Sequence, residues 1–129
     1  MVKMINFIKK IFYIFIFSFF NLFSILIENI SENELNELIK KNNIVIIEFY
    51  ATWCGPCQKM LPIFKSTAQK YLNIYFVTLN IDNNKKLAEK YNVISIPTII
   101  FIKNKKVILT NNGLIQKNEF IKKIESILK

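Results

Sequence analysis

The stretch IVIIEFY, residues 44–50, limits the folds open to this chain more than any other segment. It is apolar at almost every position, and Glu48 is its one charged residue. A strand with apolar side chains on both faces has to be covered on both sides by other elements. The segment therefore predicts the central strand of a layered α/β domain.

The segments around this strand alternate between strand-like and helix-like patterns. Ser31 and Glu34 form a capping box, which predicts that a helix begins there. We expect strands at residues 27–30, 74–82, 98–103 and 106–110, and helices from residue 31, at 57–72, at 84–91 and around 120–128. This alternation predicts one α/β domain, residues 25–129, with a mixed central sheet and helices on both faces.

Residues 1–24 form a separate N-terminal hydrophobic segment. Three lysines within the first ten residues precede residues 11–27, which carry no charge and are rich in phenylalanine. A positive flank followed by an apolar stretch is the layout of a signal peptide or an uncleaved signal anchor, and the sequence leaves both open. The flank favours a cytoplasmic N-terminus with translocation of the rest of the chain. The alternative, a buried core element, is disfavoured because the stretch has no amphipathic period.

Composition excludes several classes of function. The chain has no histidine and two cysteines, so it cannot build a four-ligand zinc site from these residues or a catalytic triad that needs histidine. We expect no metal and no cofactor. The net charge of +9 comes from lysines spread along the chain among many Asn, Ile and Phe. Codon bias explains this better than a nucleic-acid surface, so we expect no nucleic-acid partner.

The segment Trp53-Cys54-Gly55-Pro56-Cys57 carries the chemistry, because it directly follows a strand and opens a helix. Unpaired N–H groups and the helix dipole stabilise a Cys54 thiolate, which makes it the attacking nucleophile. Cys57, one turn further on and more buried, suits the resolving role that displaces a mixed disulfide. Gly55 and Pro56 permit and fix the tight turn into the helix. The alternatives are half of a metal site shared by two chains and a structural disulfide, which so short a loop disfavours.

Two residues near the cysteines carry a functional and a structural interpretation. Glu48 is the only charge in an apolar strand, so burial should raise its pKa and suit it to act as a general base. The alternative is a side chain that points to the sheet edge and solvent. Trp53 lies next to Cys54, which favours a role in recognition over the alternative of packing.

The sequence resembles the thioredoxin family. IIEFYATWCGPCQKMLPIF matches the active-site signature of that family, and NVISIPT, residues 92–98, resembles its second landmark. The likeness covers residues 25–129, essentially a whole thioredoxin domain, and every proline and glycine falls where the family pattern expects it. It implies a thioredoxin fold and a thiol-disulfide oxidoreductase whose catalytic residues are Cys54, Cys57 and Glu48.

The resemblance also implies how clients bind. Pro97 would follow a cis peptide bond opposite the cysteine pair, and the backbone of Ile96 would pair with an extended client segment. The apolar contact surface would consist of Trp53, Ile96, Pro97 and Gly113. Glu48 would lie beneath the active site and assist proton transfer at Cys57. The implied partners are disulfide-containing client proteins and a reductase or other electron donor, and we expect a monomeric domain.

The chain departs from the family pattern at four positions, of which Tyr50 is a mild change, because it replaces another aromatic residue that is common there. Glu48 stands where aspartate is usual, and Thr78 stands where the family often keeps a lysine close to the buried acid. Lys105 takes a turn position where glycine is usual, and a positive φ there costs about 1 kcal/mol.

Three functions remain open. Gly-Pro between the cysteines is the form found in reducing thioredoxins, which favours a protein-disulfide reductase. The N-terminal segment favours delivery out of the cytosol, often to an oxidising compartment. The second hypothesis is therefore an oxidase or isomerase that acts on the disulfides of secreted proteins. A non-catalytic subunit of a membrane or export assembly is the third. We expect the domain to be exported, and anchored in a membrane if residues 11–27 are retained, with the cytoplasm as the alternative.

Overall fold

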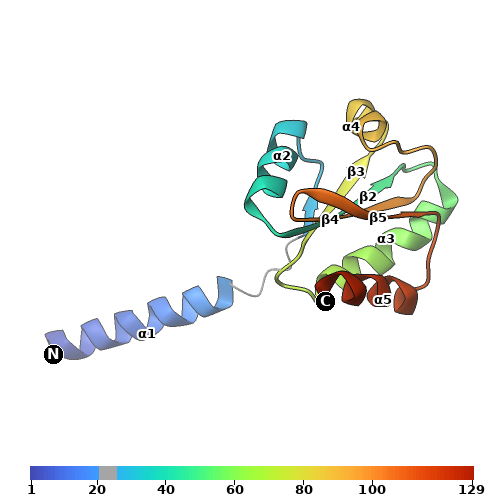
Figure 1. The fold of residues 1–129 in the computed structure, drawn as a ribbon. Coiled ribbons are helices and arrows are strands. Elements are labelled where there is room, and N and C mark those ends of the chain that lie inside the picture. The colour runs from blue at the N-terminus through green and yellow to red at the C-terminus, as the bar shows by residue number, and fades with distance from the viewer. Residues whose placement is uncertain (21–25) are drawn as a thin grey trace.

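The computed structural model describes the backbone of residues 1–20 and 26–129, and the side chains of residues 1–12 and 26–129. Helix α1 (Val2–Phe20) precedes the α/β domain and takes no part in its layers (Figure 1). Within the described residues, no helix is both long enough and apolar enough to cross a membrane. The end of the predicted leader and its boundary at residue 24 lie outside the described residues.

Five strands form one mixed sheet, in the order β1-β3-β2-β4-β5. β1 and β2 run parallel to β3, whereas β4 is antiparallel to both β2 and β5. The central position of the strand at residues 44–50 is confirmed. The strands are β1 (Leu26–Glu28), β2 (Ile44–Tyr50), β3 (Tyr75–Asn80), β4 (Thr98–Lys103) and β5 (Lys106–Asn112).

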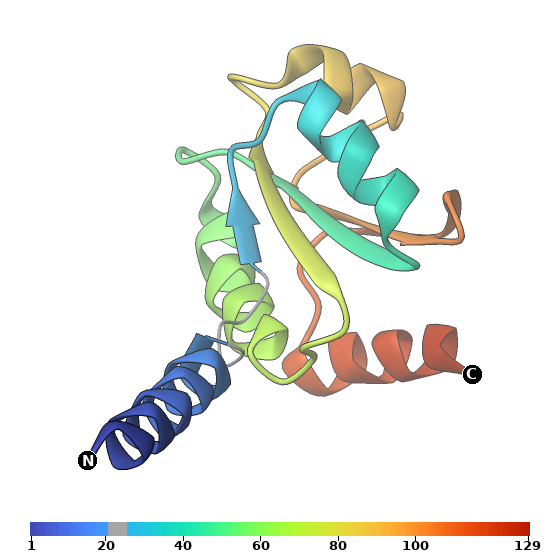
Figure 2. The same cartoon turned by 90° about the vertical axis from the view of Figure 1, so that its left-hand side faces the viewer.

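Helices cover both faces of this sheet, as the apolar character of β2 requires (Figure 1). α3 (Gly55–Ala68) and α5 (Lys117–Leu128) pack on one face, where Ile46 of β2 joins their buried side chains. α2 (Glu32–Lys41) and α4 (Lys85–Lys90) pack on the other, with Ile47. Because side chains alternate along a strand, Glu48 points to the same face as Ile46, toward α3. Figure 2 shows the short β1 at the edge of the sheet, beside β3.

Local sequence signals account for several element ends. The Ser31–Glu34 capping box is present at the start of α2. β1 ends at Glu28, earlier than predicted, because Asn29 adopts a positive φ of 54°. α3 ends at Ala68 rather than at residue 72, because the next amides bond three residues back and close turns. The expected turn between β4 and β5 is confirmed, and Lys105 has a φ of 68° there.

Candidate active site

The two cysteines lie where β2 leads into α3, and they form a disulfide with an S–S distance of 2.20 Å. Cys54 is the N-cap residue of α3, and the Cys57 N–H donates a hydrogen bond to Cys54 Sγ over 3.2 Å. Pro56 occupies the first turn, where its fixed φ suits the helix and its missing N–H costs nothing. The sulfur of Cys54 therefore lies at the positive end of the helix dipole, which favours a thiolate once the disulfide is reduced.

The two sulfurs are not equally accessible. Cys54 is 6% exposed and Cys57 is 1% exposed. This order confirms the prediction that Cys57 is the more buried of the two. Of the two cysteines, Cys54 is therefore the one that presents some surface to solvent.

A loop from the opposite side of the sheet faces the disulfide. The Ile96–Pro97 peptide bond is cis, as the resemblance implied, and the Ile96 carbonyl oxygen lies 3.8 Å from Cys54 Sγ. Gly113 donates its N–H to the Pro97 carbonyl oxygen over 2.7 Å, which brings Gly113 to the same loop. Pro97 is itself buried and Ile96 is half-buried. The fold thus collects Cys54, Ile96, Pro97 and Gly113 at one end of the sheet.

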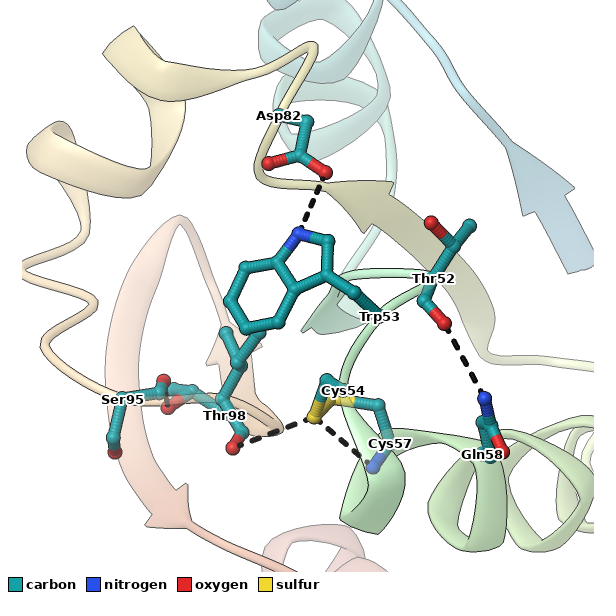
Figure 3. Close-up of a disulfide and its surroundings, with 9 residues drawn as sticks. Thr52, Trp53, Cys54, Cys57, Gln58, Asp82, Ser95 and Thr98 are labelled. Carbon is teal, nitrogen blue, oxygen red and sulfur yellow. Dashed lines mark hydrogen bonds between the residues drawn. A yellow bond between two sulfur atoms is a disulfide. The ribbon is translucent and has the colours of Figure 1, made fainter.

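Trp53 presents an exposed apolar side chain beside the cysteines. Its side chain is 67% exposed, so core packing does not account for it. Its indole N–H donates to the Asp82 carboxylate over 3.0 Å, as Figure 3 shows. Sequence reasoning missed Asp82 as part of this site. The sequence did offer a signal, because Asp82 follows a buried strand that runs parallel to β2. The carboxyl ends of parallel strands lie at the same edge of the sheet, which places Asp82 near the residues that follow β2.

Glu48 is fully buried on the α3 face, so the alternative of a solvent-facing side chain does not hold. Neither of its carboxylate oxygens has a hydrogen-bond partner within the described residues. Loss of hydration raises the pKa of Glu48 to about 8, while the positive charge of Lys65 acts in the opposite direction. The charge of this side chain therefore changes around pH 8.

No group of three or more His, Cys, Asp or Glu side chains in the described residues is arranged to hold a metal ion.

An α/β domain with a cysteine pair at a helix N-terminus, closed as a disulfide against a cis-proline loop, defines a class of thiol-disulfide redox proteins. Comparison with known families agrees, since the thioredoxin family model matches residues 26–126. The chain belongs to the thioredoxin family and is a redox protein of that family.

Similar proteins support this assignment. The thioredoxin of Mycoplasmoides gallisepticum is 40% identical over 86 residues, which cover 67% of this chain and 86% of the relative. The thioredoxin of Chlorobaculum thiosulfatiphilum is 34% identical over 99 residues, covering 76% and 92%. The oxidised form of mitochondrial thioredoxin 3 from Saccharomyces cerevisiae superposes with a TM-score of 0.72 at 31% identity, covering 78% and 94%.

Proposed function

We propose that this chain is a protein-disulfide reductase that works by dithiol-disulfide exchange through Cys54 and Cys57. The observation that carries the proposal is the disulfide at the N-terminus of α3, with its more accessible sulfur beside the exposed Trp53. The Gly-Pro dipeptide between the cysteines supports the direction of reduction. It is the form found in reducing thioredoxins, whose reduction potential of about −270 mV makes them strong reductants.

The proposed reaction moves two electrons from the reduced protein to a client. The Cys54 thiolate attacks one sulfur of a client disulfide, the client S–S bond breaks, and one client thiolate leaves. The Cys57 thiolate then attacks Cys54 Sγ in the mixed disulfide and displaces the second client sulfur. The client ends as a dithiol and the protein ends with the Cys54–Cys57 disulfide. A reductase or other electron donor has to return two electrons before the next cycle.

Glu48 is proposed as the general base for the second attack. Cys57 is buried and loses a proton before it can act as a nucleophile. A carboxyl group with a pKa of about 8 is well matched to accept a proton near neutral pH.

Client binding is proposed at the surface that Trp53, Ile96 and Gly113 form over the buried Pro97. An extended client segment would lie along the loop before Pro97 and pair with the backbone of Ile96, in the manner of an added strand. This arrangement would bring a client sulfur to Cys54, because the Ile96 carbonyl oxygen lies 3.8 Å from Cys54 Sγ.

Turnover of a protein disulfide tests this proposal. With a dithiol as electron donor, the wild-type chain should reduce insulin, and Cys54→Ser should abolish that activity while circular dichroism shows an unchanged fold. Retained activity in Cys54→Ser contradicts the assignment of the nucleophile. The reduction potential separates the second candidate function, since a value far above that of thioredoxin would indicate an oxidase or isomerase of secreted proteins. A folded protein without turnover would indicate the non-catalytic subunit.

We also propose that residues 1–24 deliver the domain, residues 25–129, out of the cytosol as a signal peptide or a signal anchor. The support is the lysine flank together with the apolar side chains among residues 1–12, which are all exposed. A reductase in an oxidising compartment would need its electrons from a donor across or within the membrane. Cell fractionation with N-terminal sequencing tests this, because an intact chain in the cytoplasm contradicts it.

A further inference from the structure

A row of three side chains crosses the sheet next to the active site. Glu28 on β1 pairs with Thr78 on β3, and Thr78 pairs with Glu48 on β2. Leu26 packs in the core on the α3 side, so Glu28, two residues later, points to that same face. The two acids therefore face α3 from either side of Thr78, which is buried and carries no charge.

Lys65 brings a positive charge to this row from α3. Its ammonium group forms an ion pair with the Glu28 carboxylate, and both side chains are about half exposed. Because β1 is the edge strand of the sheet, the pair lies where the row meets solvent. Lys65 is the group whose charge favours the ionised form of Glu48 against the burial that opposes it.

The other elements around Glu48 supply no competing charge at the paired positions. On β4 the residue opposite Glu48 is Ile99, and on β3 it is Thr78. Cys57 of α3 is held in the disulfide, and the ammonium group of Lys117 on α5 is bonded to the Ser66 hydroxyl and not to Glu48.

We propose that Lys65, held at the β1 edge by Glu28, is a positioning residue that controls when Glu48 releases its proton. The functional meaning of this control rests on the proposed role of Glu48 at Cys57. A neighbouring cation stabilises a carboxylate by Coulomb attraction; the burial of Glu48 strengthens this attraction, and the solvent around the half-exposed Lys65 weakens it. At pH 7 a group with a pKa of about 8 is ionised in about a tenth of the molecules. Removing Lys65 should lower that fraction further.

The test follows the Glu48 carboxyl group directly in the full-length chain with its disulfide intact. With 13C-labelled glutamate, an NMR titration gives the midpoint of Glu48 without any catalytic assay. Lys65→Met should move the midpoint to higher pH, and Lys65→Arg should restore it because the charge is kept. Lys59→Met is the matched control, since Lys59 lies exposed on the same helix, and it should leave the midpoint unchanged.

The proposal is overturned if Lys65→Met leaves the midpoint where it is in the wild type, or if Lys59→Met shifts it equally. Glu28 is tested by repeating Lys65→Met in a Glu28→Gln background. The shift should be smaller there, because an unanchored Lys65 spends less time near the row. A shift of equal size would contradict the anchoring role of Glu28.

A rate measurement separates this proposal from the proposed function. The pH profile for displacement of the mixed disulfide should move with the NMR midpoint in Lys65→Met. If the midpoint moves and the rate profile does not, control of Glu48 by Lys65 stands and the general-base role of Glu48 fails.

Discussion

Replacing Glu48 by glutamine should make the protein more stable at high pH, by an amount that grows steadily with pH. Glutamine keeps the size of the side chain but cannot ionise. Glu48 is buried without hydrogen bonds to its carboxylate oxygens in the described residues, so the folded state strongly prefers its protonated form. The unfolded chain hydrates the group and releases the proton readily.

The size of this effect follows from the two pKa values of Glu48. Burial raises the pKa to about 8 in the folded state, from an ordinary value of 4.5. Between these values the folded state holds one more proton than the unfolded state, so the free energy of unfolding falls as pH rises, by about 1.4 kcal/mol per pH unit. The stability that protonated Glu48 contributes to the folded state is therefore complete below pH 4.5 and is lost as the pH rises to 8. Relative to a neutral side chain, the wild type should lose about 3 kcal/mol by pH 7 and almost 5 kcal/mol by pH 9.

Urea unfolding of the oxidised wild type and Glu48→Gln at pH 5, 7 and 9 measures this loss. The difference in free energy of unfolding between the two proteins should grow in favour of glutamine by about 4 kcal/mol from pH 5 to pH 9. The pH-independent cost of the buried amide cancels in that change, and so do the other titrating groups. A difference that stays constant over this range refutes the account of Glu48.

Other substitutions test the core, the turn and the client surface. Phe120 is fully buried and contacts the rings of Phe64 and Phe76, so Phe120→Ala should lower the free energy of unfolding by about 3–5 kcal/mol in urea. Lys105→Gly should raise it by somewhat less than about 1 kcal/mol, because glycine relieves the positive φ but has more freedom when unfolded; a clear loss of stability would count against strain at that turn. Trp53→Ala should raise KM for protein clients and leave turnover of a small disulfide unchanged, and an equal loss with both substrates would mean that Trp53 serves the cysteines rather than the client.

The sequence predicted the features that depend on local pattern. The apolar run at residues 44–50 and the Ser31–Glu34 capping box each specify their structure through near neighbours, and both are present. The two cysteines were placed correctly because their spacing and position after a strand are fixed by the chain itself. Burial of Glu48 followed from its apolar surroundings within the same strand.

The resemblance predicted that the Pro97 loop lies opposite the cysteines, but the other contacts between distant segments were not predicted. Trp53 and Asp82 are 29 residues apart, and the Lys65–Glu28 ion pair joins α3 to β1. The Trp53–Asp82 contact depends on the register of β2 and β3. The Lys65–Glu28 contact depends on how α3 packs against the sheet, and a local sequence pattern shows neither. The end of α3 was also missed, because residues 69–72 continue a helix-like pattern although the backbone turns away after Ala68.

The central claim, that Cys54 attacks and Cys57 resolves, is tested most directly by trapping the mixed disulfide. Reduced Cys57→Ser is mixed with a disulfide-bonded client peptide, quenched in acid, and analysed by intact mass and peptide mapping. The account predicts one adduct that carries half of the client on Cys54, and no adduct in the double variant with Cys54→Ser. A folded, fully reduced Cys57→Ser protein that forms no adduct with the client would contradict the assignment of Cys54 as the attacking group.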